Sequence, residues 1–107
     1  MMPTKNIELL TRWVAALRSG EYKQLHGDLT ITSKNHGARH CCLGVLQAIE
    51  PSIESDGGLL NAKHLTNHMG CGINQYELAE MNDEQDKPFT EIADYIERVY
   101  INNEEGK

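Results

Sequence analysis

The chain has 107 residues, 39% of them hydrophobic and 24% charged, which suits one folded domain with a modest core and excludes a wholly disordered chain. Sixteen acidic residues against ten basic ones give a net charge of −6. This charge predicts no non-specific binding to nucleic acid and no attraction to an anionic membrane. No apolar run approaches the roughly 18 residues that a membrane-spanning helix needs.

The charges are unevenly distributed along the chain. Six basic residues lie within the first forty positions, whereas the last thirty are strongly acidic, so a local cationic surface is expected in the N-terminal half. Residues 1–19 lack the apolar centre of a signal peptide. Three cysteines, an odd number, cannot all pair within one molecule, which favours reduced thiols and a cytoplasmic location.

Residues 4–19 predict an amphipathic helix, because apolar side chains recur at helical spacing from Ile7 to Leu17 and Gly20 stands at the natural end. The lone tryptophan, Trp13, lies on the apolar stripe and is predicted to anchor the core. Weak alternation over 27–32 and turn residues at 34–37 then predict a short strand or β-hairpin, with Arg39 and His40 on the returning strand.

Residues 42–50 form an apolar run that predicts a buried helix, which Pro51 ends. Gly44 inside this run indicates that a second element approaches closely. Residues 52–60 are predicted as a loop and 82–87 as a polar connector, with a frayed tail at 102–107. Further helices are predicted at 62–69, 74–81 and 88–100, with Pro88 in the first turn of the last one.

These elements predict a single α+β domain over residues 1–107, mainly helical, with about four to five helices and a short β-hairpin. The first helix, the helix that begins at the cysteine pair and the last helix are expected to share the core.

The adjacent Cys41 and Cys42 begin a predicted helix, where the helix dipole and free N–H groups lower the pKa of a thiol. One of them could then act as a nucleophile, with His40 or His64 as its base. The alternative, which the apolar surroundings and Gly44 favour, is that both thiols are small hydrophobes in the core.

His64 and His68 stand four residues apart, so a helix would place them on one face, and Cys71 follows three residues later. Together with a thiolate of the cysteine pair they could form a tetrahedral zinc site. Two surface histidines on a polar helix are the favoured alternative, because the chain has no Cys-x-x-Cys pair. No other cofactor is predicted.

Basic and aromatic residues of the N-terminal half could surround an anion, with bidentate contacts from arginine and a stacking face from tyrosine. These candidates are Arg12, Arg18, Tyr22, Lys23 and Arg39. The favoured alternative places the two helical arginines on the outer face of an amphipathic helix.

Four segments together resemble a family of small, mostly uncharacterised proteins encoded by tailed bacteriophages and prophages. They are WVAALRSGEYKQ at 13–24, CCLGVL at 41–46, LAEMND at 78–83 and FTEIADYIE at 89–97. The resemblance implies an accessory role in the cytoplasm of an infected bacterium and brings no catalytic residue with it. This chain departs from the family pattern at His40, where an aromatic residue is usual, and in the stretch 67–72.

The leading functional hypothesis is a non-enzymatic binding protein with an anti-defence role. It would inhibit a host protein or sequester a small signalling nucleotide, and an acidic surface can imitate nucleic acid. The expected partners are therefore a host protein or a small anionic ligand, with a homo-oligomer left open. A cysteine-dependent enzyme and a small zinc protein are the alternatives.

Overall fold

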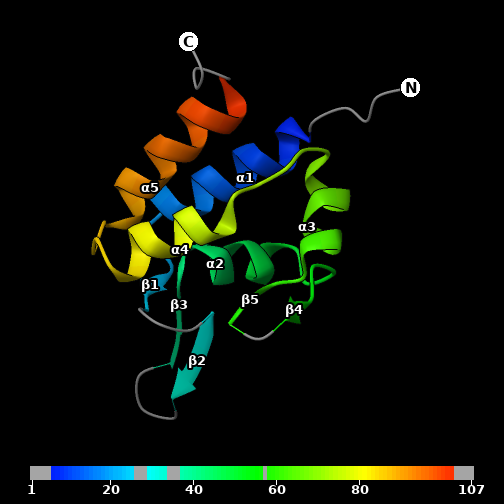
Figure 1. The fold of residues 1–107 in the computed structure, drawn as a ribbon. Coiled ribbons are helices and arrows are strands. Elements are labelled where there is room, and N and C mark those ends of the chain that lie inside the picture. The colour runs from blue at the N-terminus through cyan, green and yellow to red at the C-terminus, as the bar shows by residue number, and fades with distance from the viewer. Residues whose placement is uncertain (1–5, 26–28, 34–36, 57, 103–107) are drawn as a thin grey trace.

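Five α-helices dominate the part of the chain that the structure describes, a computed structural model covering residues 6–25, 29–33, 37–56 and 58–102 (Figure 1). In chain order the elements are α1 (Ile7–Arg18), β1 (Lys23–Gln24), β2 (Thr30–Ser33), β3 (Gly37–His40), α2 (Cys42–Ile49), β4 (Ser55–Asp56), β5 (Leu59–Leu60), α3 (Ala62–Met69), α4 (Gln75–Asp83), α5 (Phe89–Ile96) and the π-helix η1 (Glu97–Ile101). The predicted class, mainly helical α+β with a short hairpin, is confirmed. Of the tail predicted at 102–107, only Asn102 lies within the described residues.

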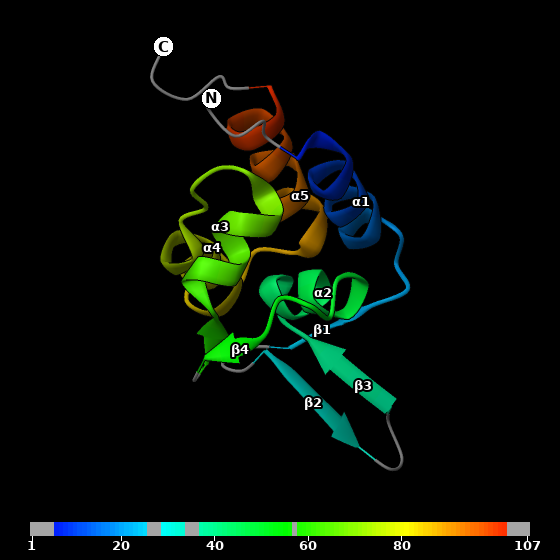
Figure 2. The ribbon, with the colours of Figure 1, turned by 90° about the vertical axis from the view of Figure 1, so that its right-hand side faces the viewer.

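The core lies where α1 packs against α2 and α5, and both ribbon views place α1 beside α5 with α2 beneath them (Figures 1 and 2). Trp13 is fully buried there, and its indole Nε1–H donates to the backbone oxygen of Cys42 at 2.9 Å. This bond satisfies the one polar atom of an otherwise apolar side chain. The predictions of a tryptophan anchor and of a core shared by three helices are both confirmed.

Asn6 joins the start of α1 to the end of α3. Its side-chain oxygen accepts from Leu9 N at 3.0 Å, which caps the helix, while its side-chain amide donates to His68 O at 2.8 Å. Its own backbone N–H donates to Met69 O at 2.7 Å. The apolar stripe of α1 lies on the buried face as predicted from Leu10 to Leu17, whereas Ile7, its predicted first member, is exposed. The helix ends two residues before Gly20, which has φ +80°.

The hairpin predicted around 27–40 is the antiparallel pair β2 and β3, within a three-stranded sheet of order β1-β3-β2. The turn predicted at 34–37 lies, apart from Gly37, outside the described residues. Strand β1, which runs parallel to β3 and pairs Lys23 with Arg39, was not predicted. A long-range contact holds β1, because the Gln24 amide donates to Asn82 Oδ1 at 2.9 Å and to Lys87 O at 2.8 Å.

Helix α2 begins one residue after Cys41 and packs directly on the backbone that leads into β2. A Cβ atom at Gly44 would overlap the carbonyl oxygen of Leu29, and Cys41 N donates to that same oxygen at 2.9 Å. The predicted close approach at Gly44 is therefore confirmed.

The second half keeps the predicted helices with two corrections. The segment 52–60, predicted as a loop, contains the small antiparallel pair β4 and β5, where the Gln75 side chain bonds both backbone groups of Leu60. Asn82, predicted in a polar connector, belongs to α4 and is fully buried. Its burial is possible because its amide is satisfied by Gln24, Leu25 and Asp83.

The last helix begins one residue later than predicted and changes its hydrogen-bonding pattern near its end. Pro88 is the N-cap of α5 and stands outside its first turn. From Glu97 the helix continues as η1, and Asn102 N donates to Glu97 O at 2.8 Å. Among the described residues, none of these helices is long and apolar enough to cross a membrane.

Candidate functional site

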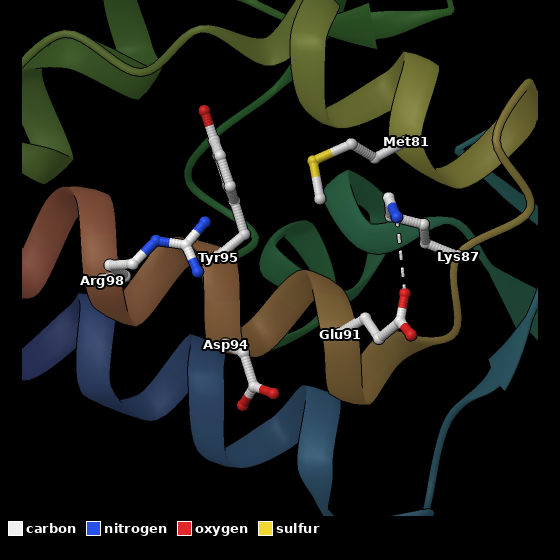
Figure 3. A pocket seen from close by; sticks show the side chains of 6 residues that line it. All are labelled: Met81, Lys87, Glu91, Asp94, Tyr95 and Arg98. Carbon is white, nitrogen blue, oxygen red and sulfur yellow. Dashed lines mark ion pairs between the residues drawn. The ribbon is translucent and has the colours of Figure 1, made fainter. Parts of the chain in front are cut away.

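A cavity of about 360 Å³ opens between α4 and α5. Its lining comes from α4, from the connector before α5, and from α5 with η1 (Figure 3): Met81, Lys87, Glu91, Asp94, Tyr95 and Arg98. Its size falls at the lower end of the range of about 300–1,000 Å³ that is usual for ligand-binding pockets. We refer to it as the α4–α5 pocket.

One side of the pocket combines an aromatic ring with a cation. The Arg98 guanidinium carbon lies 5.6 Å from the centre of the Tyr95 ring, a cation–π arrangement. Figure 3 shows the Met81 thioether directed into the same space from α4. The pocket thus offers apolar contact at Met81 and Tyr95 beside a planar cation.

The carboxylates of the pocket already have cationic partners. Lys87 Nζ lies 3.5 Å from Glu91 Oε2, four residues later in the chain, and Figure 3 marks this ion pair. Asp94 and Glu97 both bind Arg18 of α1, at 2.7 and 3.0 Å, and these two bonds raise the pKa of that guanidinium. Among the described residues no carboxylate lies within ion-pair distance of Arg98, whose guanidinium instead lies against the Tyr95 ring.

The π-helix borders a second cavity on the other side of α5. This cavity, about 270 Å³, lies between α1 and η1 and includes Val14, Ala15 and Ile101 in its lining. The hydroxyl oxygen of Tyr100 accepts from Asn74 N at 3.0 Å, which ties η1 to the start of α4. Because π-helical turns are frequent at functional sites, the C-terminal helix with its two cavities is the strongest candidate surface.

The two thiols predicted as nucleophiles are buried. Cys41 Sγ accepts from Gly44 N at 3.4 Å, and the Cys42 thiol donates to Leu78 O at 3.6 Å. The favoured alternative, burial in the core, is confirmed, and the lowered pKa of the nucleophile hypothesis is wrong: burial raises the pKa of Cys41 and raises that of Cys42 well above its usual value. Loss of solvation outweighs the N–H groups at the helix start, so both thiols occupy the core as neutral groups.

His40, the predicted base, packs between two neighbours of the sheet region. Its Nδ1 lies 2.9 Å from Thr30 Oγ1, and its ring meets Tyr22 edge-on with 5.4 Å between centres. Burial lowers the pKa of the imidazole, which keeps it neutral at neutral pH.

The residues of the predicted zinc site have separate partners. His64 Nδ1 accepts from Glu54 N at 3.3 Å, and His68 Nδ1 lies 3.7 Å from Glu50 Oε1. Cys71 is half-buried beyond the end of α3. Within the described ranges, no three histidine, cysteine or acidic residues gather closely enough to hold a metal ion, so these side chains are not brought together as predicted.

The five residues of the predicted anion site are distributed over three places. Arg12 donates to Ile49 O at 3.2 Å, and Arg18 binds α5. Tyr22 contacts His40, while Lys23 and Arg39 occupy paired positions of β1 and β3 and are both exposed. The structure therefore brings only Lys23 and Arg39 side by side as a cationic pair.

The residues of the α4–α5 pocket were not predicted, although one signal for them exists. Lys87, Glu91, Asp94 and Arg98 recur at spacings of four, three and four, which places them along one polar helix face. The contribution of Met81 depends on how α4 packs against α5, which no local pattern reveals.

Alkylation should distinguish the three thiols. We expect iodoacetamide at pH 8 to modify Cys71 in the folded protein and to leave Cys41 and Cys42 unmodified, because burial keeps them protonated and covered. In denaturant all three should react at similar rates. Peptide mass spectrometry over pH 6 to 9 provides the measurement, and rapid native modification of Cys41 or Cys42 would contradict the burial of these thiols.

Comparison with known proteins finds a partial match. Residues 5–56 are similar to the family model described as a domain of unknown function (DUF8296). The matched segment runs from the residue before Asn6 to the end of β4, and the α4–α5 pocket lies outside it. Neither a curated protein nor a solved structure matches the chain.

Proposed function

We propose that this protein is a non-enzymatic binding protein whose α4–α5 pocket receives a side chain of a partner protein with a basic surface. The observation that carries the proposal is the composition of the pocket wall. Methionine, tyrosine and arginine are enriched at protein interfaces, and here Met81, Tyr95 and Arg98 line one cavity.

The charge around the pocket determines the kind of partner. Glu80 and Glu84 are exposed on and just after α4, and Glu91 and Asp94 are exposed on α5. The chain as a whole carries a net charge of −6. Such a field accelerates the approach of a basic surface and disfavours an acidic one.

The phage resemblance supplies the biological setting of the proposal. A small acidic protein made during infection would act in the bacterial cytoplasm, where proteins that bind nucleic acid present basic surfaces. By occupying such a surface, this protein would inhibit a host defence protein. The acidic helices would take the place of the nucleic acid.

Substitution of Tyr95 or Arg98 by alanine tests the proposal. The tagged protein is used to capture partners from a lysate of a bacterium that tailed phages infect, and each captured protein is purified and titrated by calorimetry. For a true partner, either substitution should weaken binding by about 30-fold, the effect of losing a central hot-spot side chain of about 2 kcal/mol. Raising the salt concentration should weaken binding by the wild-type chain.

Lys63→Ala provides the matched control, because Lys63 is exposed on α3 and does not line the pocket. It should leave the affinity unchanged, and circular dichroism should show all variants folded. A captured partner that binds the Tyr95 and Arg98 variants as tightly as the wild type would overturn the proposed site. A partner with an acidic surface would overturn the proposed chemistry.

A small anionic ligand is a second candidate for the same pocket. It is favoured by one observation: the Arg98 guanidinium lies beside the Tyr95 ring, which offers a stacking face, and Lys87 lines the same pocket. Titration with nucleoside mono-, di- and cyclic phosphates, read by calorimetry, tests it directly. Binding that Arg98→Ala abolishes would favour a nucleotide, and no heat at millimolar ligand would exclude this candidate.

A further inference from the structure

The β2–β3 hairpin projects from the helical body and leaves β2 at the edge of the sheet (Figure 2). The strand order β1-β3-β2 places β3 on one side of β2 and no described strand on the other. An edge strand of this kind presents backbone N–H and C=O groups that can pair with another chain.

The register identifies which backbone groups face outward. Cys41 N donates to Leu29 O one position beyond the pair Thr30 and His40, which indicates where the hydrogen-bonded positions of the ladder fall. Because such pairs alternate with non-hydrogen-bonded ones, Thr30 and Thr32 direct their N–H and C=O groups away from β3. Within the described ranges, Thr30 makes no backbone bond outside the sheet.

The base of this edge is held rigidly, which lowers the entropy lost on binding. Thr30 Oγ1 lies 2.9 Å from His40 Nδ1, and the adjoining Leu29 backbone rests on α2 at Gly44. Strand β1 supports β3 from its other side. An incoming strand would therefore meet backbone groups that are already in position.

The charge beside this edge is opposite to that of the chain as a whole. Lys23 and Arg39 are exposed neighbours in one row across β1 and β3, and the same row continues to Ile31 of β2. An added strand would lie about two strand spacings, or roughly 10 Å, from Arg39, a gap that an arginine and a glutamate side chain together can span. A second copy of the β2–β3 hairpin would give Arg39 no acidic partner, because neither strand contains an acidic residue.

We infer that the outer edge of β2 binds an extended, acidic segment of a partner protein, which adds a strand to the sheet. Backbone bonds to Thr30 and Thr32 would provide affinity, and the Lys23–Arg39 pair would select acidic sequence. This surface is distinct from the α4–α5 pocket, so its test is independent of the proposed function.

The probe is a fluorescent eight-residue peptide of alternating glutamate and valine, compared with its lysine–valine counterpart. We expect the acidic peptide to bind at low salt at least tenfold more tightly than the basic one, as measured by anisotropy. In amide NMR spectra, Thr30 and Thr32 should shift on binding. An acidic peptide methylated on alternate backbone nitrogens cannot pair and should not bind.

A change in the protein tests the same bond: Thr32→Pro removes the outward backbone N–H of residue 32. Proline is tolerated at such an edge position because the lost N–H is not bonded within the sheet. It should weaken binding of the acidic peptide at least tenfold, whereas the matched Thr32→Val, which keeps the N–H, should preserve it. Arg39→Glu should reverse the preference between the acidic and basic peptides.

Three results would overturn the inference. The first is absence of binding at millimolar acidic peptide, and the second is equal binding of the methylated peptide. The third is concentration-dependent dimerisation in sedimentation that Thr32→Pro abolishes, since this would make a second copy the occupant of the edge. The methylated peptide keeps the test decisive even where Thr32→Pro fails to fold.

Discussion

Gly44→Ala is expected to destabilise the fold by about 3 kcal/mol or more, at or beyond the upper end of the usual cost of overpacking. The added Cβ atom would overlap the carbonyl oxygen of Leu29 and crowd Thr30 Oγ1. A backbone carbonyl cannot move aside like the end of a flexible side chain. The strain must therefore separate α2 from the start of β2 and weaken the bond from Cys41 N to Leu29 O.

Urea unfolding followed by circular dichroism measures this effect, with Gly72→Ala as the matched control. An added Cβ at Gly72 meets no atom within 4 Å, so its substitution should change the free energy of unfolding by less than about 0.5 kcal/mol. Equal midpoints for the two variants would show that α2 does not rest on Leu29 as described. Amide NMR of Thr30 and His40 should reveal the local change in the Gly44 variant.

Much of the fold could be predicted, because its helices follow local patterns. Helix ends follow local rules, and Asn61 and Gly70 indeed stand at the two caps of α3, the latter with φ +70°. Apolar periodicity located the buried face of α1 in the same way. Each of these features depends on residues within a few positions of one another.

Features that depend on distant partners were missed. Strand β1 has two residues and no periodicity, and its position is set partly by Gln24 bonds to residues 58 and 63 positions away. For the cysteine pair the favoured interpretation, burial in the core, is confirmed, and the lowered pKa that the nucleophile hypothesis required is wrong, because burial raises the pKa of both thiols. The pocket was not predicted, because its lining depends on how α4 meets α5.

Asn82→Asp should produce a large and pH-dependent loss of stability. Asn82 is fully buried, and its amide nitrogen donates to Leu25 O and to Asp83 Oδ1, each at 2.7 Å. A carboxylate would place an oxygen against these two acceptors, with only Gln24 as a donor. Burial of this unpaired charge should cost about 3 kcal/mol or more at pH 7.

The direction of the pH dependence follows from the raised pKa expected for the new carboxyl group in the folded state. Below the unfolded pKa of about 3.9 the group is neutral in both states, and its protonated form can still donate to Leu25 O. As pH rises above that value, the unfolded chain releases the proton first. Stability should then fall by up to about 1.4 kcal/mol per pH unit until the folded pKa is reached.

Asn82→Leu separates this effect from the loss of hydrogen bonds. With leucine at position 82, Leu25 O and the Gln24 amide each lose one hydrogen-bond partner. This loss should lower the free energy of unfolding by about 1–3 kcal/mol at every pH. Urea midpoints measured from pH 4 to pH 8 should therefore diverge between the aspartate and leucine variants as pH rises. Parallel curves would mean that water reaches position 82, and that the amide network joining β1 to α4 is not a buried one.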